Sequence, residues 1–175
     1  MQKAYFNNEA LMNEQDRLVA ANNDLISAFK DHGMPVILAR TEHQPDKSTW
    51  TLNMLDRSSG YLFEKDTDSD FVDGLITDTM PTLVKTRDSA FHGTDLSDRL
   101  HTLGIKQLVL TGVSTHSCVL YTAADAYAAS FRAILASDAI ASHDPTYHRS
   151  TLAMLDQEYK QKSLTNKEIL RPLED

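Results

Sequence analysis

The chain contains one cysteine, Cys118, in the stretch GVSTHSCVLYTAADAY (residues 112–127), where an apolar strand pattern passes into a helical pattern. A thiol in the first turn of a helix lies near free backbone N–H groups and the positive end of the helix, and both favour the thiolate. The same amides could receive the oxyanion that forms when a thiolate attacks a carbonyl group. Cys118 is therefore a candidate nucleophile; the alternative is a small buried apolar residue.

A lysine closes a separate apolar run, TLVK (residues 82–85). Burial of an ammonium group is unfavourable unless the group has a partner, so Lys85 is a second candidate for a functional residue. The alternative is a side chain that extends to the surface. Because parallel strands end at the same edge of a sheet, we expect Lys85, the segment 111–118 and Asp138 to lie at that edge.

Helical and strand patterns alternate along the chain and must position these residues. Helical spacing of apolar residues covers 13–32, 94–103, 117–131 and 144–159, and a short helix is expected around 50–57. Short apolar runs indicate strands at 34–40, 82–86, 105–112 and 132–138, and a weak final strand is expected near 162–165. This alternation predicts an α/β fold in one domain (1–175), with a doubly wound, mostly parallel sheet and helices on both faces.

Charge and composition exclude several classes of function. The net charge of −8 argues against a nucleic-acid partner and against an anionic membrane surface, since both select for basic patches. A single cysteine excludes an intrachain disulfide and fits a reducing compartment. The sequence has no apolar run that could span a membrane and no signal-peptide pattern, so we expect a cytoplasmic protein.

Three blocks of the sequence resemble the isochorismatase-like cysteine hydrolases. They are KTRDSAFHGTDL (85–96), LGIKQLVLTGVSTHSCVLYTAADAY (103–127) and SDAIASHDPTYHRSTLAML (137–155), and the opening MQKAYF resembles the end of the family's first-strand motif. The resemblance implies a three-layer fold with strand order 3-2-1-4-5-6. It also implies an assembly of two or four copies, a homodimer or homotetramer.

The resemblance further implies a catalytic triad of Asp, Lys and Cys. Cys118 would attack a carbonyl carbon and form a covalent intermediate, and Lys85 would lower the pKa of the thiol. The aspartate would act as general base and then as acid. In the family a cis peptide bond, here between Val113 and Ser114, turns the Ser114 amide toward the Cys118 amide and forms an oxyanion hole.

The triad aspartate and the first strand of the family pattern have no counterpart in this sequence. By the resemblance the aspartate would directly precede Met1, and its strand would lie between the runs at 34–40 and 105–112. Without it we expect two half-sheets with exposed edges and an unfilled core. Three explanations stay open: omitted upstream residues, a start assigned to an internal methionine, or an inactive chain that folds without the strand. No replacement carboxylate is nominated, because the candidates lie in loop or helix contexts: Glu9, Asp16 and Glu42.

The resemblance favours a metal-free amidase acting on a C–N bond of a small amide or carbamoyl compound. True isochorismatases of the family lack the cysteine, and nicotinamidases carry an Asp-x-His-x-His metal site, where this chain has only His43 in ARTEHQPDKSTW (39–50). We interpret His43 as a solvated loop residue and expect neither metal nor cofactor. The acidic stretch DTDSD (66–70) lacks the glycine and glutamate of a calcium loop and is expected to be solvated. Within the family, the chain in this respect resembles the metal-free N-carbamoylsarcosine or ureidoacrylate amidohydrolases.

Three residues are candidates for substrate binding: Phe6, Trp50 and His116. The alternative for Phe6 and Trp50 is an apolar contact at the end of an element, and for His116 it is packing or solvent exposure at the helix start. Arg87 is either a surface charge or a substrate anchor. The rival function is a non-catalytic family member that binds a small ligand or a partner protein through the same pocket. No pattern specifies the substrate itself.

Overall fold

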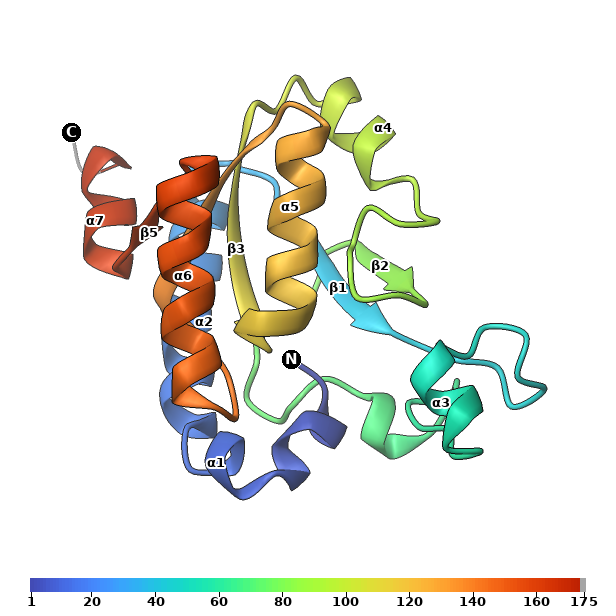
Figure 1. Ribbon diagram of the computed structural model, residues 1–175. Coiled ribbons are helices and arrows are strands. Elements are labelled where there is room, and N and C mark those ends of the chain that lie inside the picture. The colour runs from blue at the N-terminus through green and yellow to red at the C-terminus, as the bar shows by residue number, and fades with distance from the viewer. Residues whose placement is uncertain (174–175) are drawn as a thin grey trace.

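Parallel strands form two separate sheets in the computed structural model, which describes residues 1–173 (Figure 1). The smaller sheet pairs β1 (Leu38–Thr41) with β2 (Thr82–Lys85). The larger sheet has the order β3 (Gln107–Val113), β4 (Arg132–Ala141) and β5 (Ser163–Leu164). Each of these pairings is parallel. The predicted α/β class is confirmed, and so is the weak final strand.

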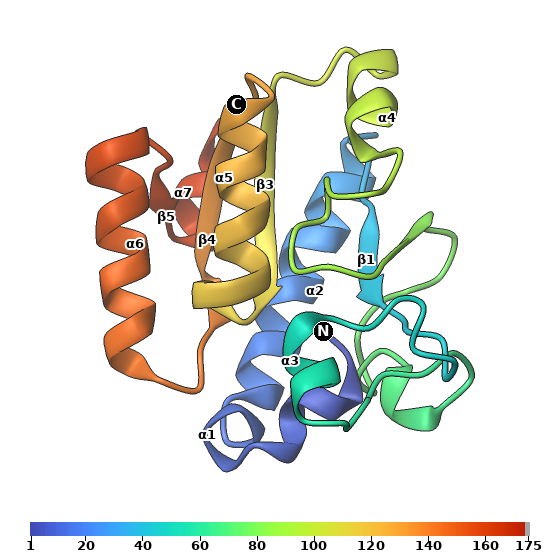
Figure 2. The same ribbon diagram turned by 45° about the vertical axis from the view of Figure 1, so that its right-hand side comes forward.

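Helices cover both faces of the larger sheet. In Figure 1, α5 (Leu120–Ala128) and α6 (Pro145–Tyr159) stand at the front and α2 (Gln15–Asp31) is seen behind α6, and Figure 2 shows α5 and α2 on opposite sides of β3. The helices are α1 (Glu9–Met12), α2 (Gln15–Asp31), α3 (Leu52–Asp56), α4 (Leu96–Thr102), α5 (Leu120–Ala128), α6 (Pro145–Tyr159) and α7 (Asn166–Leu170). Short segments of 3-10 helix are η1 (Lys3–Asn7), η2 (Thr67–Ser69) and η4 (Arg171–Leu173), and η3 (Thr115–Val119) is π-helical. Within residues 1–173, no helix is long and apolar enough to cross a membrane.

Alternation along β4 decides which helices cover each face of the larger sheet. Leu135 is fully buried and packs in one cluster with Leu155 of α6. The next residue, Ala136, packs in another cluster with Leu25 of α2 and Ile169 of α7. Because successive side chains of a strand point to opposite faces, this one strand contributes to the cores on both sides.

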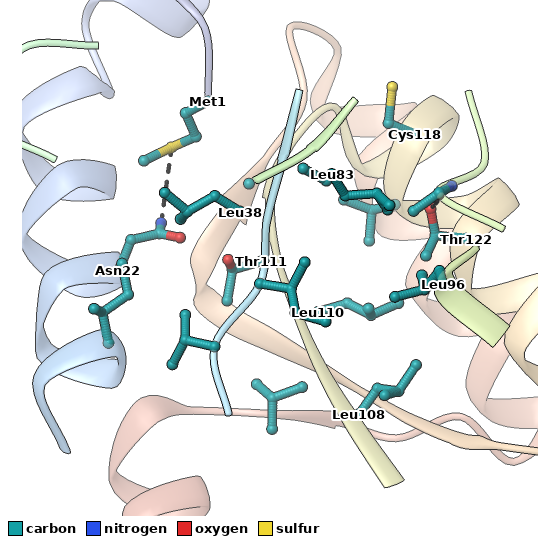
Figure 3. A pocket seen from close by; sticks show the side chains of 18 of the residues that line it. Met1, Asn22, Leu38, Leu83, Leu96, Leu108, Leu110, Thr111, Cys118 and Thr122 are labelled. Atoms are coloured by element: carbon teal, nitrogen blue, oxygen red, sulfur yellow. Dashed lines mark hydrogen bonds between the residues drawn. The ribbon is translucent and has the colours of Figure 1, made fainter. Parts of the chain in front are cut away.

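A largely apolar cavity of about 350 Å³ lies between the two sheets. Leu38 of β1 lines one side of it, and Leu108 and Leu110 of β3 line the other (Figure 3). Among the described residues no ladder joins β1 to β3, so the expected strand order appears as two pieces, β2-β1 and β3-β4-β5. The prediction of two half-sheets around an unfilled core is confirmed.

Two strands differ in extent from the sequence prediction. Strand β1 begins at Leu38 rather than at residue 34, because its only ladder partner in the described chain is β2, which begins at Thr82 and is equally short. Strand β4 continues to Ala141, because its pairing with β3 resumes after an irregularity between Leu110 and Gly112. Gly112 has a φ of +104°, a conformation that favours glycine.

We predict that Leu135→Ala lowers the free energy of unfolding by about 2–5 kcal/mol, since it removes a side chain buried between β4 and the α5–α6 layer. Urea or guanidinium unfolding followed by circular dichroism measures this change. The matched control is Leu52→Ala in α3, where the side chain is 77% exposed and the cost should stay within about 0.5 kcal/mol. Equal losses in the two variants would contradict the packing described here.

Candidate active site

The ammonium group of Lys85 is buried at the carboxyl ends of β1 and β2, and the residue is only 6% exposed. Nζ donates to Thr41 Oγ1 at 2.9 Å and to the Arg87 carbonyl oxygen at 2.7 Å. It also lies 3.6 Å from Cys118 Sγ. Polar partners on several sides compensate the loss of water around the charge. Lys85 therefore does not extend to the surface, and it meets Cys118 at the edge of the sheets as the strand pattern predicts.

Gln2 fixes the end of β1, where Thr41 binds the lysine. Its side-chain amide donates to the Thr41 carbonyl oxygen at 2.8 Å and accepts from the Thr41 N–H at 2.7 Å. A third bond, to the Ser69 carbonyl oxygen at 2.8 Å, connects the same amide to η2. The buried Gln2 side chain thus forms hydrogen bonds with both the N–H and the carbonyl group of Thr41. These bonds fix the backbone of Thr41, whose hydroxyl accepts from Lys85.

Cys118 lies in the π-helical turn η3, at the start of the segment that continues as α5. The peptide bond between Val113 and Ser114 is cis, at the position that the resemblance implies. Thr115 is fully buried, and its hydroxyl lies 2.9 Å from Nδ1 of His148 in α6. The turn that carries the thiol is therefore anchored both to β3 and to α6. Cys118 itself lies at one end of the cavity (Figure 3).

A carboxylate that the sequence analysis did not nominate contacts the thiol. The Cys118 thiol donates to Asp88 Oδ1, with Sγ and Oδ1 3.6 Å apart. Asp88 lies in the loop after β2, three residues beyond Lys85. The sequence analysis considered Glu9, Asp16 and Glu42 and nominated none of them, and it did not consider Asp88. The only signal in the sequence was the short distance from Lys85, and a loop pattern does not show where its side chains point.

Burial raises the pKa of the Cys118 thiol above its ordinary value. The Lys85 ammonium lowers this pKa, in the direction that the resemblance implies, while the Asp88 carboxylate raises it. The net shift is upward, because the effect of burial exceeds that of the Lys85 ammonium. A nucleophilic role for this sulfur then requires an acceptor for its proton.

Tyr5, rather than its neighbour Phe6, faces the cavity. Phe6 is buried in a core cluster with Leu18 and Val113. Burial raises the pKa of the Tyr5 phenol, and the charge of Cys118 adds to this shift. Burial also raises the pKa of the Tyr61 phenol, and the charges of Cys118 and Asp88 raise it further. Tyr5 therefore lines the cavity together with Cys118, and the sequence analysis did not name it.

Trp50 and His116, which the sequence analysis named as candidates for substrate binding, each make hydrogen bonds and ring contacts within the protein. The Trp50 indole donates to the Gln44 carbonyl oxygen at 2.9 Å, and its ring lies 6.0 Å from that of Phe63. Nδ1 of His116 lies 2.6 Å from Ser142 Oγ, and its ring also contacts His143 and Tyr147. Burial lowers the pKa of His116, and His143 lowers it further. A role of either residue in substrate binding stays a prediction.

Two expectations about single residues are wrong. His43 is 1% exposed rather than solvated, because its backbone bridges to residues 62 and 64 and its Nδ1 lies 2.9 Å from the Thr49 carbonyl oxygen. Burial lowers its pKa. Asp138 does not reach the strand-end site, because β4 continues beyond it, and its carboxylate instead accepts from the Asn166 N–H at 2.8 Å.

Arg87 holds the long loop between β1 and β2. It donates to the carbonyl oxygens of Thr49 and Thr86, each at 2.7 Å. Since Thr49 is also the partner of His43, the two side chains share one carbonyl group of the loop. Within residues 1–173, no three His, Cys, Asp or Glu side chains are gathered as a metal ion would need.

Comparison with known proteins gives one family over most of the chain. The model of the isochorismatase domain matches residues 1–165. Nicotinamidase 3 of Arabidopsis thaliana is 30% identical over 127 residues, which are 70% of this chain and 63% of that protein. The isochorismatase family protein PncA of Bacillus subtilis is 46% identical over 69 residues, which are 39% of this chain and 38% of that protein. The chain thus spans less than two thirds of the length of either protein.

Solved structures show the same similarity. The crystal structure of N-carbamoylsarcosine amidase from Thermoplasma acidophilum matches with a TM-score of 0.75 and 26% identity. The match covers 88% of this chain and 85% of that chain.

We predict that iodoacetamide alkylates Cys118 with a pH midpoint above the value of about 8.5 for a free thiol, since the thiolate is the reactive form and the pKa is raised. Intact-mass spectrometry follows the single adduct from about pH 6.5 to 10.5. Lys85→Met removes the charge that lowers this pKa, so its midpoint should rise further. The control Lys30→Met, an exposed residue of α2, should match the wild type. A wild-type midpoint below 8 would contradict this account of the thiol.

Proposed function

The chain belongs to the isochorismatase family of hydrolases, and we propose that it is a cysteine hydrolase that cleaves a C–N bond in a small amide or carbamoyl compound. The observation that carries this proposal is the buried Lys85 ammonium, which lies 3.6 Å from the only thiol of the chain. A buried cation costs free energy unless it is paired, and here it is placed where a thiolate would form.

In the proposed reaction, Cys118 Sγ attacks the carbonyl carbon of the substrate. The Lys85 ammonium stabilises the negative charge that develops on sulfur, and the backbone amides of Ser114 and Cys118 receive the oxyanion. Collapse of the tetrahedral intermediate expels the amine and leaves a thioester, which water hydrolyses. The reaction needs a proton acceptor for the thiol and a proton donor for the departing nitrogen.

The similarity to proteins named nicotinamidase and N-carbamoylsarcosine amidase supports an amide as the substrate class. The same proposal includes a homodimer or homotetramer and a location in the reducing cytoplasm, where a catalytic thiol stays free.

A second candidate function is binding of a small ligand without turnover. The observation that favours it is the raised pKa of Cys118, because an unused buried thiol would also be protonated. Burial of the Lys85 ammonium against the sulfur favours the hydrolase, since a binding pocket has no need of that pair.

We predict ammonia release from at least one member of a panel that contains nicotinamide, N-carbamoylsarcosine and short primary amides. Cys118→Ser should lower kcat/KM by about 10³-fold or more, because the hydroxyl is a much weaker nucleophile than the thiolate. Lys85→Met should lower it by about 10²-fold, and the exposed Lys30→Met variant serves as the matched control.

Circular dichroism must show that these variants fold before their rates are compared. Turnover that persists in Cys118→Ser would overturn the cysteine mechanism. No turnover of the panel, together with a rise in Tm on addition of one of its members, would instead support the binding function.

A further inference from the structure

An exposed negative charge lies beside the Cys118 thiol. The Asp88 side chain is exposed to solvent, and its Oδ1 lies 3.6 Å from Sγ. We propose that Asp88 selects the substrate by charge, favouring small amides that carry an ammonium group close to the scissile carbonyl over those that carry a carboxylate there. Asp88 would thereby define the substrate class of the proposed hydrolase function, on which this inference rests.

The loop after β2 holds Asp88 by anchoring the residues on both sides of it. The Arg87 carbonyl oxygen accepts from Lys85 Nζ at 2.7 Å. On the other side, the buried Ala90 donates its N–H to Thr122 Oγ1 of α5 at 3.0 Å. The backbone is therefore fixed against both the smaller sheet and α5, so the exposed carboxylate keeps its place beside the thiol.

The two cations of this region already have partners. The three N–H groups of Lys85 are directed to Thr41 Oγ1, to the Arg87 carbonyl oxygen and to Cys118 Sγ. Arg87 Nη1 donates to two backbone carbonyl oxygens, each at 2.7 Å. A substrate carboxylate beside the thiol would therefore face the charge of Asp88, and Lys85 would have no N–H left to bind it.

The negative charge of Asp88 is not neutralised by its surroundings. Within residues 1–173, no cationic side chain forms an ion pair with this carboxylate. Burial raises the pKa of Tyr5 and of Tyr61, so both phenols stay neutral, and burial lowers the pKa of His116. The charge of Asp88 raises the pKa of each of these three side chains, which come from three separate segments. A charged substrate at the thiol would be exposed to the same field.

The distance makes the effect large enough to measure. Two unit charges about 4 Å apart change an equilibrium about fivefold in water, and more where the protein lowers the dielectric constant. Asp88 attracts an ammonium group and repels a carboxylate, so the two factors multiply when the two substrates are compared. The ratio of their rates should therefore depend on Asp88 by about 10- to 30-fold at low ionic strength.

The first experiment compares three amides of similar size: cationic 3-aminopropanamide, neutral butanamide and anionic succinamate. In the wild type, kcat/KM should fall in that order. Asp88→Asn should lower the ratio of the cationic to the anionic amide by about 10- to 30-fold, whereas Asp88→Glu should largely retain it. The control is Asp24→Asn, a change of the same charge at an exposed position of α2, which should leave the ratio as it is.

The second experiment measures the same preference without hydrolysis. The single thiol is labelled with 2-(trimethylammonium)ethyl methanethiosulfonate, which is cationic, and with 2-sulfonatoethyl methanethiosulfonate, which is anionic, and intact-mass spectrometry gives both rates. Because both reagents react with the thiolate, a change in the pKa of Cys118 cancels in the ratio of the two rates. Asp88→Asn should lower the ratio of cationic to anionic labelling by about 10-fold, and Asp24→Asn should not change it.

The outcomes separate the charge preference from the hydrolase function. A labelling ratio that is the same in Asp88→Asn and the wild type would overturn the proposal, and so would amide hydrolysis whose substrate ratio does not change. Loss of the preference in Asp88→Glu as well would show that the shape of the loop, rather than the charge, decides it. If the labelling ratio falls but the wild type hydrolyses none of the three amides, charge selection at the thiol is supported and the hydrolase function fails.

Discussion

Burial of the Lys85 ammonium is the constraint on which the site depends. Removing one partner of a buried charge costs several kcal/mol, so each of its contacts must be held by the fold. Thr41 comes from the neighbouring strand, the Arg87 carbonyl from the following loop, and the sulfur of Cys118 from η3, which follows β3 of the larger sheet. Because the two sheets share no ladder within the described chain, this polar cluster is one of the connections that fix their relative position.

The electrostatics of the sulfur follow from the same placement. Water would stabilise a thiolate, but the residues around Cys118 exclude much of it, and one cation does not replace that loss. The thiol donates to Asp88 Oδ1, whose negative charge also raises the pKa of the sulfur. In the proposed hydrolase, such a thiol would have to lose its proton during the reaction.

Sequence reasoning succeeded where regular geometry decides the outcome. Lys85 ends β2 and Cys118 follows β3. The ends of parallel strands lie at one edge of a sheet, so their meeting could be predicted. Asp88 could not be predicted, because its direction depends on a hydrogen bond from Ala90 to Thr122 in a distant helix. The sequence analysis named Phe6 for substrate binding, whereas Tyr5 lines the cavity and Phe6 packs in a core cluster. Both residues lie in the 3-10 segment η1, where neither the alternation of a strand nor the period of an α-helix indicates which side chain faces the cavity.

Helix α2 has its burial partners far away along the chain. Asn22 of this helix donates to the Ala139 carbonyl oxygen of β4, 117 residues later, and Leu25 packs beside that strand. During synthesis the ribosome adds roughly 5–20 residues per second, so the apolar stripe of α2 waits on the order of 10 s before β4 emerges. Over that interval Leu25 lacks its partner in β4, whereas Leu18 of the same helix can already pack with Phe6 and Val72. The part of the core between α2 and β4 therefore forms only after residues 132–141 have been synthesised, which makes it a contact of high sequence separation.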